Sequence, residues 1–249
     1  MSRSNPTENS APNPATRWFE WNGEVGNVRY YDKEAKANVE VGLPFTFIVL
    51  DELGSVKGWN EASKSGIYSN EVRDTRQDVL IVKAFKGGTL AEGLYKDIRD
   101  HVTSKSVGGQ FTMNCYIAFK TGQALMMGAI QFKGATLGAW MEFRKAHRAE
   151  ILTKAVRMTG FTEGKKGRIT FRVPVFTLAE LAPESNAAAV ALDITLQTYL
   201  KAYLSRTKRD QVDTPVPHVR DEDIGEDEPP TPTDADFDTT PSYDDEIPF

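Results

Sequence analysis

The sequence predicts a mainly β protein with added helices, followed by an acidic tail. Short aromatic and β-branched segments, bounded by Gly, Asn, Asp and Ser, dominate residues 17–133 and are typical of strands. Helical spacing of apolar residues is found in a few stretches, such as Leu90–Thr103, in which Leu94, Ile98 and Val102 share one face. After Asp210, Asp, Glu, Pro and Thr replace almost all large apolar residues, so this segment cannot bury enough apolar surface to fold.

The order of the elements gives a more specific expectation. A helix, Leu90–Thr103, follows the first strands and precedes a hairpin of two more strands. This is the element order of an OB-fold, a five-stranded barrel with a helix between its third and fourth strands. Before the helix, the segments Arg17–Asn22 and Val25–Tyr31 are followed by Val39–Leu50 and by Asp78–Lys86, the third strong strand. After the helix come the strands Gln110–Lys120 and Gln123–Lys133.

A hairpin and two helices are expected to extend this barrel. The helices are Leu137–Ile151 and Ser185–Arg206, the latter capped by Ser185, and the hairpin comprises residues 154–162 and 168–177. The predicted division of the chain is a disordered N-terminus (1–16), an OB-fold domain with its extension (17–206), a disordered acidic linker (207–243) and a terminal tip (244–249).

The charge of the chain is divided unevenly. The 249 residues carry a net charge of −5, but residues 211–249 hold 13 acidic side chains and one basic one. The tail is therefore at −12 and residues 1–210 are at +7. A basic body joined to an acidic tail is typical of nucleic-acid-binding proteins with a regulatory or recruiting appendage.

Other features of the sequence argue against several classes of protein. Cys115 is the only cysteine, so no intrachain disulfide can form, and three scattered histidines make a zinc site improbable. No apolar run approaches the roughly 20 residues that span a bilayer, and the first residues do not resemble a signal peptide. The sequence has no phosphate loop and no nucleophile elbow, and the carboxylates of the body are scattered without a recognisable pair, so an enzyme is not expected. The prediction is a cytoplasmic protein without metal or cofactor.

The last residues form the sharpest motif in the chain. Phe249 offers an aromatic ring and an α-carboxylate suited to an apolar pocket with a basic rim, and Pro248 restricts the backbone. This tip resembles that of bacterial single-stranded DNA-binding proteins, which ends Asp-Asp-Asp-Ile-Pro-Phe; Glu246 is the one departure. The resemblance implies binding to host helicases, nucleases, polymerase subunits and primase through Asp244, Asp245, Glu246, Ile247, Pro248 and Phe249. The body is more similar to divergent OB-fold proteins of this class encoded by bacteriophages.

Binding to a single strand without sequence preference requires cations for the phosphates and aromatic faces for the bases. Lys57 to Tyr68 are expected in an exposed loop, and Tyr116 on an open strand face opposite the apolar face of Phe111 to Phe119. Trp59 and Tyr116 are the preferred stacking residues. The full set of candidates is Arg29, Tyr30, Tyr31, Lys57, Trp59, Lys64, Tyr68, Lys83, Phe85, Lys86, Tyr116, Lys120, Arg168 and Arg172.

Several of these side chains have a second interpretation. Alternation places one of Tyr30 and Tyr31 inside the fold, and Phe85 is equally suited to the core. Arg168 and Arg172, near Lys165 and Lys166, either extend a binding groove or only face solvent. Trp18 and Trp140 are expected in the core, whereas Trp21 is undecided.

The function predicted from these features is to coat single-stranded DNA during phage replication, recombination and repair, and to recruit host proteins through the tip. Two alternatives remain open: a strand-annealing recombination protein, and a decoy that occupies host tail-binding pockets without binding DNA. Self-association, as a dimer or as a cooperative array on DNA, is also left open.

Overall fold

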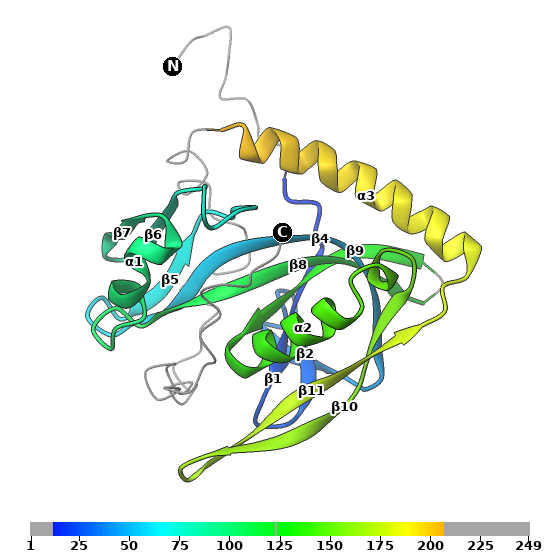
Figure 1. Ribbon diagram of the computed structural model, residues 1–249, viewed down its shortest axis with the longest axis horizontal. Helices are drawn as coiled ribbons and strands as arrows, with labels where there is room; N and C mark the ends of the chain where they lie inside the picture. The colour runs from blue at the N-terminus through cyan, green and yellow to red at the C-terminus, as the bar shows by residue number, and fades with distance from the viewer. Residues whose placement is uncertain (1–11, 123, 207–249) are drawn as a thin grey trace, which may run out of the picture.

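A computed structural model describes residues 12–122 and 124–206. This part of the chain is mainly β, with three α-helices and one short 3-10 helix (Figure 1). In chain order the elements are β1 (Arg17–Asn22), β2 (Asn27–Asp32), β3 (Ala37–Val41), β4 (Phe45–Asn60), β5 (Ser65–Ser69), β6 (Leu80–Ala84), β7 (Gly88–Gly93), α1 (Tyr95–Val102), β8 (Gly109–Thr121), β9 (Ala124–Lys133), α2 (Gly134–Ala146), η1 (Glu150–Leu152), β10 (Ala155–Lys166), β11 (Ile169–Ala179) and α3 (Pro183–Leu204).

The strands form one mixed, open sheet. Its hydrogen-bonded order is β3-β2-β1-β9-β8-β4-β5-β6-β7, and β10 joins the start of β4 and pairs with β11. Only the β1–β9 contact is parallel among the strand pairs of the described residues. The prediction of a mainly β fold is confirmed, but this strand order does not close on itself, so the expected five-stranded OB barrel is not what the sheet forms. The reason is the length of β4. Its second half pairs with β5, which pairs with β6, and β6 pairs with β7, so the sheet continues past the strands that a barrel would need.

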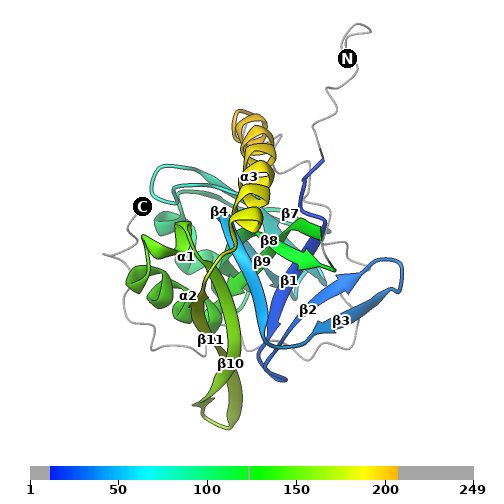
Figure 2. The same ribbon diagram turned by 90° about the vertical axis from the view of Figure 1, so that its right-hand side faces the viewer.

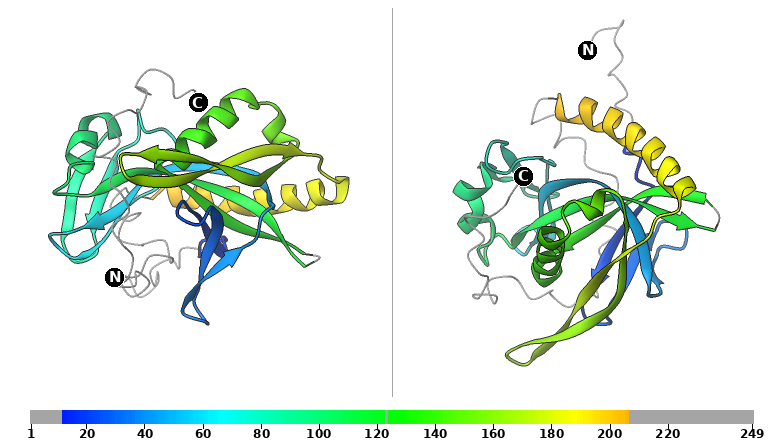
Figure 3. Two further views of the ribbon diagram at one scale, coloured as in Figure 1. Left: turned by 90° about the horizontal axis from the view of Figure 1, so that it is seen from below. Right: turned by 45° about the vertical axis from the view of Figure 1, so that its right-hand side comes forward.

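Helices cover the two faces of the central strands from opposite sides. In Figure 1 α3 runs above β4, β8 and β9, and α2 lies below them, an arrangement that the views of Figure 3 also show. The α2 face holds the main core, in which Trp140 is fully buried against Phe132 with ring centroids 4.8 Å apart. The expectation that Trp140 is a core residue is confirmed, and Trp21, which was undecided, is 7% exposed.

The β10–β11 hairpin projects from the main core and contacts the turn between β1 and β2 (Figure 2). Backbone and side-chain bonds hold this contact: Arg172 N donates to the Gly23 carbonyl at 2.8 Å, and Trp21 Nε1 donates to the Arg172 carbonyl at 2.8 Å. The antiparallel pairing of β10 with β11 confirms the predicted hairpin, which is a few residues longer than expected.

Other element boundaries differ from the predictions. The expected strand Val39–Leu50 is divided between β3 and β4 by the segment Gly42 to Pro44. The expected loop around Trp59 is the second half of β4, where Gly58 is needed because a Cβ there would lie 2.1 Å from the Gly108 carbonyl. The start of the predicted helix Leu90–Thr103 is strand β7, and α1 begins at Tyr95. Ser185 does not cap α3, which begins at Pro183 with Ala182 as its cap.

The predicted disordered segments and the tip lie outside the described residues, apart from residues 12–16. None of the described helices has the length and apolar character needed to cross a membrane.

Candidate nucleic-acid interface

Strand register brings seven of the predicted residues onto one face of the sheet. Lys57 is paired with Gln110, Trp59 with Gly66, and Tyr68 with Lys83, and paired residues point to the same side. The same alternation reaches β1 and β2 through the pairs Gln131–Glu20 and Glu20–Arg29. Together with two residues that the sequence reasoning missed, Trp18 and Lys133, these side chains form what we call the aromatic–basic face: Trp18, Arg29, Tyr31, Lys57, Trp59, Tyr68, Lys83, Phe85 and Lys133.

All nine side chains of the aromatic–basic face are half-buried. The rings of Tyr68 and Phe85 stack on each other with centroids 4.5 Å apart. This stack fixes both rings on the sheet and leaves part of each available to solvent. Rings held in this way lose little conformational entropy when a further planar group stacks on them.

The cations of the face are interleaved with its rings. Lys57 Nζ lies 5.3 Å from the centroid of the Trp18 ring, a cation–π distance. Arg29 pairs with Glu20 at 2.7 Å, so that one acidic side chain of this region is already neutralised. Lys133, opposite Thr112 in the register, lies on the same side. The face therefore joins positive charge to aromatic surface over both halves of the sheet.

Lys57 has the most perturbed ionisation on this face. Desolvation lowers its pKa to about 7, and the positive charge of Lys133 acts in the same direction, whereas Glu71 and Glu20 oppose the shift. Burial raises the pKa of Glu71, despite hydrogen bonds that favour its charged form. The charge of Lys57 consequently changes near neutral pH.

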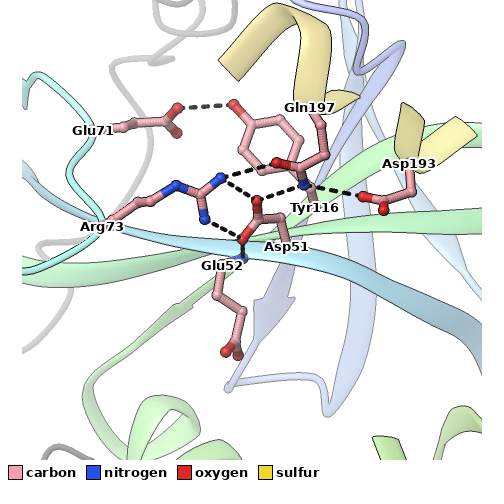
Figure 4. Close-up of polar contacts among 7 residues, drawn as sticks. All are labelled: Asp51, Glu52, Glu71, Arg73, Tyr116, Asp193 and Gln197. Carbon is pink, nitrogen blue, oxygen red and sulfur yellow. Dashed lines mark hydrogen bonds and ion pairs between the residues drawn. The ribbon is translucent and has the colours of Figure 1, made fainter. Parts of the chain in front are cut away.

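The placement of Tyr116 on an open face has to be corrected. Tyr116 lies on the same side of the sheet as Lys57, but it is fully buried and its hydroxyl donates to Glu71 Oε2 at 2.8 Å (Figure 4). Asn13 Nδ2 also donates to that hydroxyl, at 3.0 Å. The cause is α3, whose Leu196 and Leu200 pack over this end of the face. Tyr116 is a core residue and cannot stack on a base.

The other predicted residues lie apart from the face. Tyr30 points into the main core, with its ring 5.6 Å from that of Phe19, as the alternation argument anticipated for one of the two tyrosines. Lys64 lies in the β4–β5 turn and pairs with Glu61, while Lys86 is exposed in the β6–β7 turn. Arg168 is exposed at the hairpin turn.

Lys120 and Arg172 belong to two further local structures. Lys120 and Arg17 line a pocket of about 310 Å³ at the end of the main core, together with Phe19, Phe45 and Phe119. Arg172 lies over the Phe161 ring at 5.1 Å and donates to the Glu24 carbonyl, so it holds the hairpin against the β1–β2 turn. Its role in the fold is therefore structural.

Of the two residues that the sequence reasoning missed, Trp18 and Lys133, only Trp18 carries a signal in the sequence. Trp18, expected in the core from the sequence, is half-buried on the side of β1 opposite to Phe19. Alternation with Phe19 permits this outward ring, but its neighbours on β9 and β4 come from distant segments. Lys133 ends a predicted strand and carries no signal of its own. Within the described part of the chain, no group of three or more His, Cys, Asp or Glu side chains is arranged to hold a metal ion.

Comparison with protein families, with curated proteins and with solved structures finds no match to this chain. The predicted partner-binding residues 244–249 lie outside the described residues.

Proposed function

We propose that the protein binds single-stranded DNA without sequence preference through the aromatic–basic face. The observation that carries this proposal is that five aromatic rings and four cations lie on the same side of the sheet. They belong to β1, β2, β4, β5 and β9, to β6 and to the residue that follows β6. Rings stack on any base, and cations follow the phosphates of any sequence, so neither group selects a sequence.

The half-exposed state of the rings favours a single strand over a duplex. Bases in a duplex are stacked on each other, and their faces are not accessible without unstacking. A face of stacking rings therefore gains more from a strand whose bases are already free. We propose that the DNA strand lies across one face of the sheet, as it does in OB-fold proteins. This mode of binding does not require a closed barrel.

The tail supplies the second half of the proposal. With a charge of −12 and the terminal Ile247, Pro248 and Phe249, it would recruit genome-maintenance proteins of a bacterial host in the cytoplasm, in which a phage protein of this kind would act. It would also compete with phosphates for the basic body, to which it is covalently tethered.

A titration with oligo(dT) at two salt concentrations tests the binding of DNA and the competition by the tail. We expect binding at low salt that weakens steeply as salt is added, because Lys and Arg side chains that bind the phosphates release the counterions condensed on the strand. A chain that ends at Asp210 should bind more tightly than the full chain at low salt and about equally at high salt. A full chain with Phe249→Ala keeps the tail charge and serves as the matched control, with unchanged DNA affinity. Failure to bind oligo(dT) at low salt would exclude the proposed function.

Affinity for oligo(dT) should fall as the pH rises from 6 to 8. Lys57, with a pKa of about 7, is mostly charged at the lower pH and mostly neutral at the higher one. Loss of one charge-assisted contact predicts a decrease of roughly one order of magnitude at low salt.

Two variants separate this effect from other titrations. Lys57→Met should weaken binding at pH 6 and remove most of the pH dependence. Lys133→Met removes a cation from the same face and should weaken binding while the pH dependence remains, with its midpoint moved to higher pH because the Lys133 charge no longer lowers the pKa of Lys57. An unchanged pH profile in Lys57→Met would show that another group is responsible.

A further inference from the structure

The outer flank of α3 lacks charge over most of its length. The inner flank packs on β4 and β9 through Leu196, Leu200 and Tyr203, which are at most 2% exposed. On the opposite flank, Val190 is 53% and Ile194 63% exposed. Figures 1 and 2 show this helix along the edge of the molecule, with one side turned away from the sheet.

The inner contacts fix which flank faces outward. Gln197 Nε2 donates to Asp51 Oδ2 at 2.9 Å, and Arg73 pairs with the same carboxylate at 2.7 Å (Figure 4). Asp193 accepts a further bond from Gln197 at 3.1 Å. The polar residues in the middle of α3 are thus used on its sheet side, and rotation of the helix would break these bonds.

The outer flank has the spacing of a coiled-coil seam. Alternating steps of three and four residues run along one side of the helix. The seam residues are Glu184, Ala187, Ala191, Ile194, Thr198 and Lys201, all of them exposed.

The threonines of this flank do not make it polar. Thr198 Oγ1 donates to the Ile194 carbonyl at 2.9 Å, and Thr195 Oγ1 donates to the Ala191 carbonyl at 3.2 Å. Since both hydroxyls already donate hydrogen bonds within the helix, the flank between Glu184 and Lys201 needs no further polar partners.

The seam is complementary to itself when a second copy lies antiparallel to it. Antiparallel seams pair the two kinds of seam position, so Ile194 of one copy meets the small Ala191 of the other. At both ends Glu184 of one copy meets Lys201 of the other. A parallel pair would instead place each charge against its like. One twofold axis near the middle of α3 therefore satisfies every position of the seam.

We propose that the outer flank of α3 is a self-association surface, on which a second copy of this chain packs its own α3 in the antiparallel direction. This inference does not depend on DNA binding. The seam is about 25 Å long, which is small for a stable interface. The dimer should therefore be weak in free solution, in the micromolar range or above, and favoured wherever copies are concentrated along one strand.

Sedimentation of the full chain without DNA, at low salt and up to about 0.1 mM protein, tests the proposal. We expect a monomer–dimer equilibrium. Glu184→Lys should raise the dissociation constant about tenfold, because the twofold axis turns two attractive contacts into two repulsive ones. Lys201→Glu should act alike. The double variant Glu184→Lys/Lys201→Glu exchanges the charges and should restore the dimer, which excludes misfolding as the cause.

A second substitution tests the apolar middle of the seam. Ile194→Lys, at a 63% exposed position, should abolish the dimer while far-ultraviolet circular dichroism stays unchanged. A full chain that stays monomeric at all concentrations overturns the proposal, including the case in which its own tail covers α3. A dimer that is insensitive to Ile194→Lys, or single charge variants that the double variant does not rescue, overturns it as well.

Discussion

The double variant Trp59→Ala/Tyr68→Ala should lose about 30-fold to 20,000-fold in affinity for oligo(dT), because each base–aromatic stack contributes about 1–3 kcal/mol. Trp59 and Tyr68 lie on neighbouring strands and point to the same side, so a strand that crosses β4 and β5 would contact both. Each single variant should lose a smaller share. Because both side chains are half-buried, the double variant should still fold, which circular dichroism would check.

Fluorescence gives a second measure of the same contact. Trp140 and Trp21 are 0% and 7% exposed, so quenching by oligo(dT) should come from Trp59 and Trp18. Trp59→Phe keeps a ring for stacking and should lose much of the quenching with little loss of affinity. Tyr30→Leu removes a ring on the core side of β2 and, as a control, should bind normally. Full affinity in the double variant would place the strand elsewhere on the protein.

Local patterns were sufficient for much of the fold. The hairpin β10–β11, the pair β8–β9 and the core position of Trp140 follow from alternation, turn residues and apolar spacing, which act between near neighbours. The length of β4 did not follow, because Gly54, Ser55 and Gly58 interrupt its apolar pattern and resemble a loop. These residues are accepted in a strand because β8 and β5 flank them and supply backbone partners.

The site was only partly predictable for a related reason. Alternation correctly separated Tyr30 from Tyr31, and composition selected Lys57, Trp59 and Tyr68. No local pattern could show that Tyr116 is covered, since its cover is supplied by a helix about 80 residues further along the chain. The same limit hid Trp18, whose cation–π contact with Lys57 is made only by the tertiary fold.

Under the proposed function, the two faces of the sheet have separable roles. The face under α2 is closed by large aromatic residues. The opposite face is closed by α3 at one end and left half-exposed at the other, where the aromatic–basic face lies. Substitutions on the first face should therefore change stability, and substitutions on the second should change binding.

Trp140→Ala should lower the free energy of unfolding by about 3–5 kcal/mol, the usual cost of removing a large buried aromatic side chain. The Trp140 ring is fully buried, stacks on Phe132 and meets Phe176 edge-on at 5.3 Å. For a body of this size the melting temperature should fall by roughly 6–20 °C. Urea unfolding followed by circular dichroism would measure the loss. Trp59→Phe, on the opposite face, is the control and should unfold at nearly the same urea concentration as the parent chain.

Trp140→Phe separates the packing of this ring from its hydrogen bond. The Trp140 Nε1–H donates to Glu52 Oε1 at 2.6 Å, and Arg144 pairs with the other carboxylate oxygen at 2.9 Å. Burial raises the pKa of Glu52, while Arg144 and the Trp140 donor both lower it. Removing that donor penalises the charged carboxylate more than the protonated one. The variant should therefore lose about 1–3 kcal/mol at pH 7, and its deficit should shrink as the pH falls and Glu52 takes up a proton. A deficit that does not shrink at any pH at which the parent chain stays folded would mean that packing alone, and not the bond to Glu52, accounts for the contribution of Trp140.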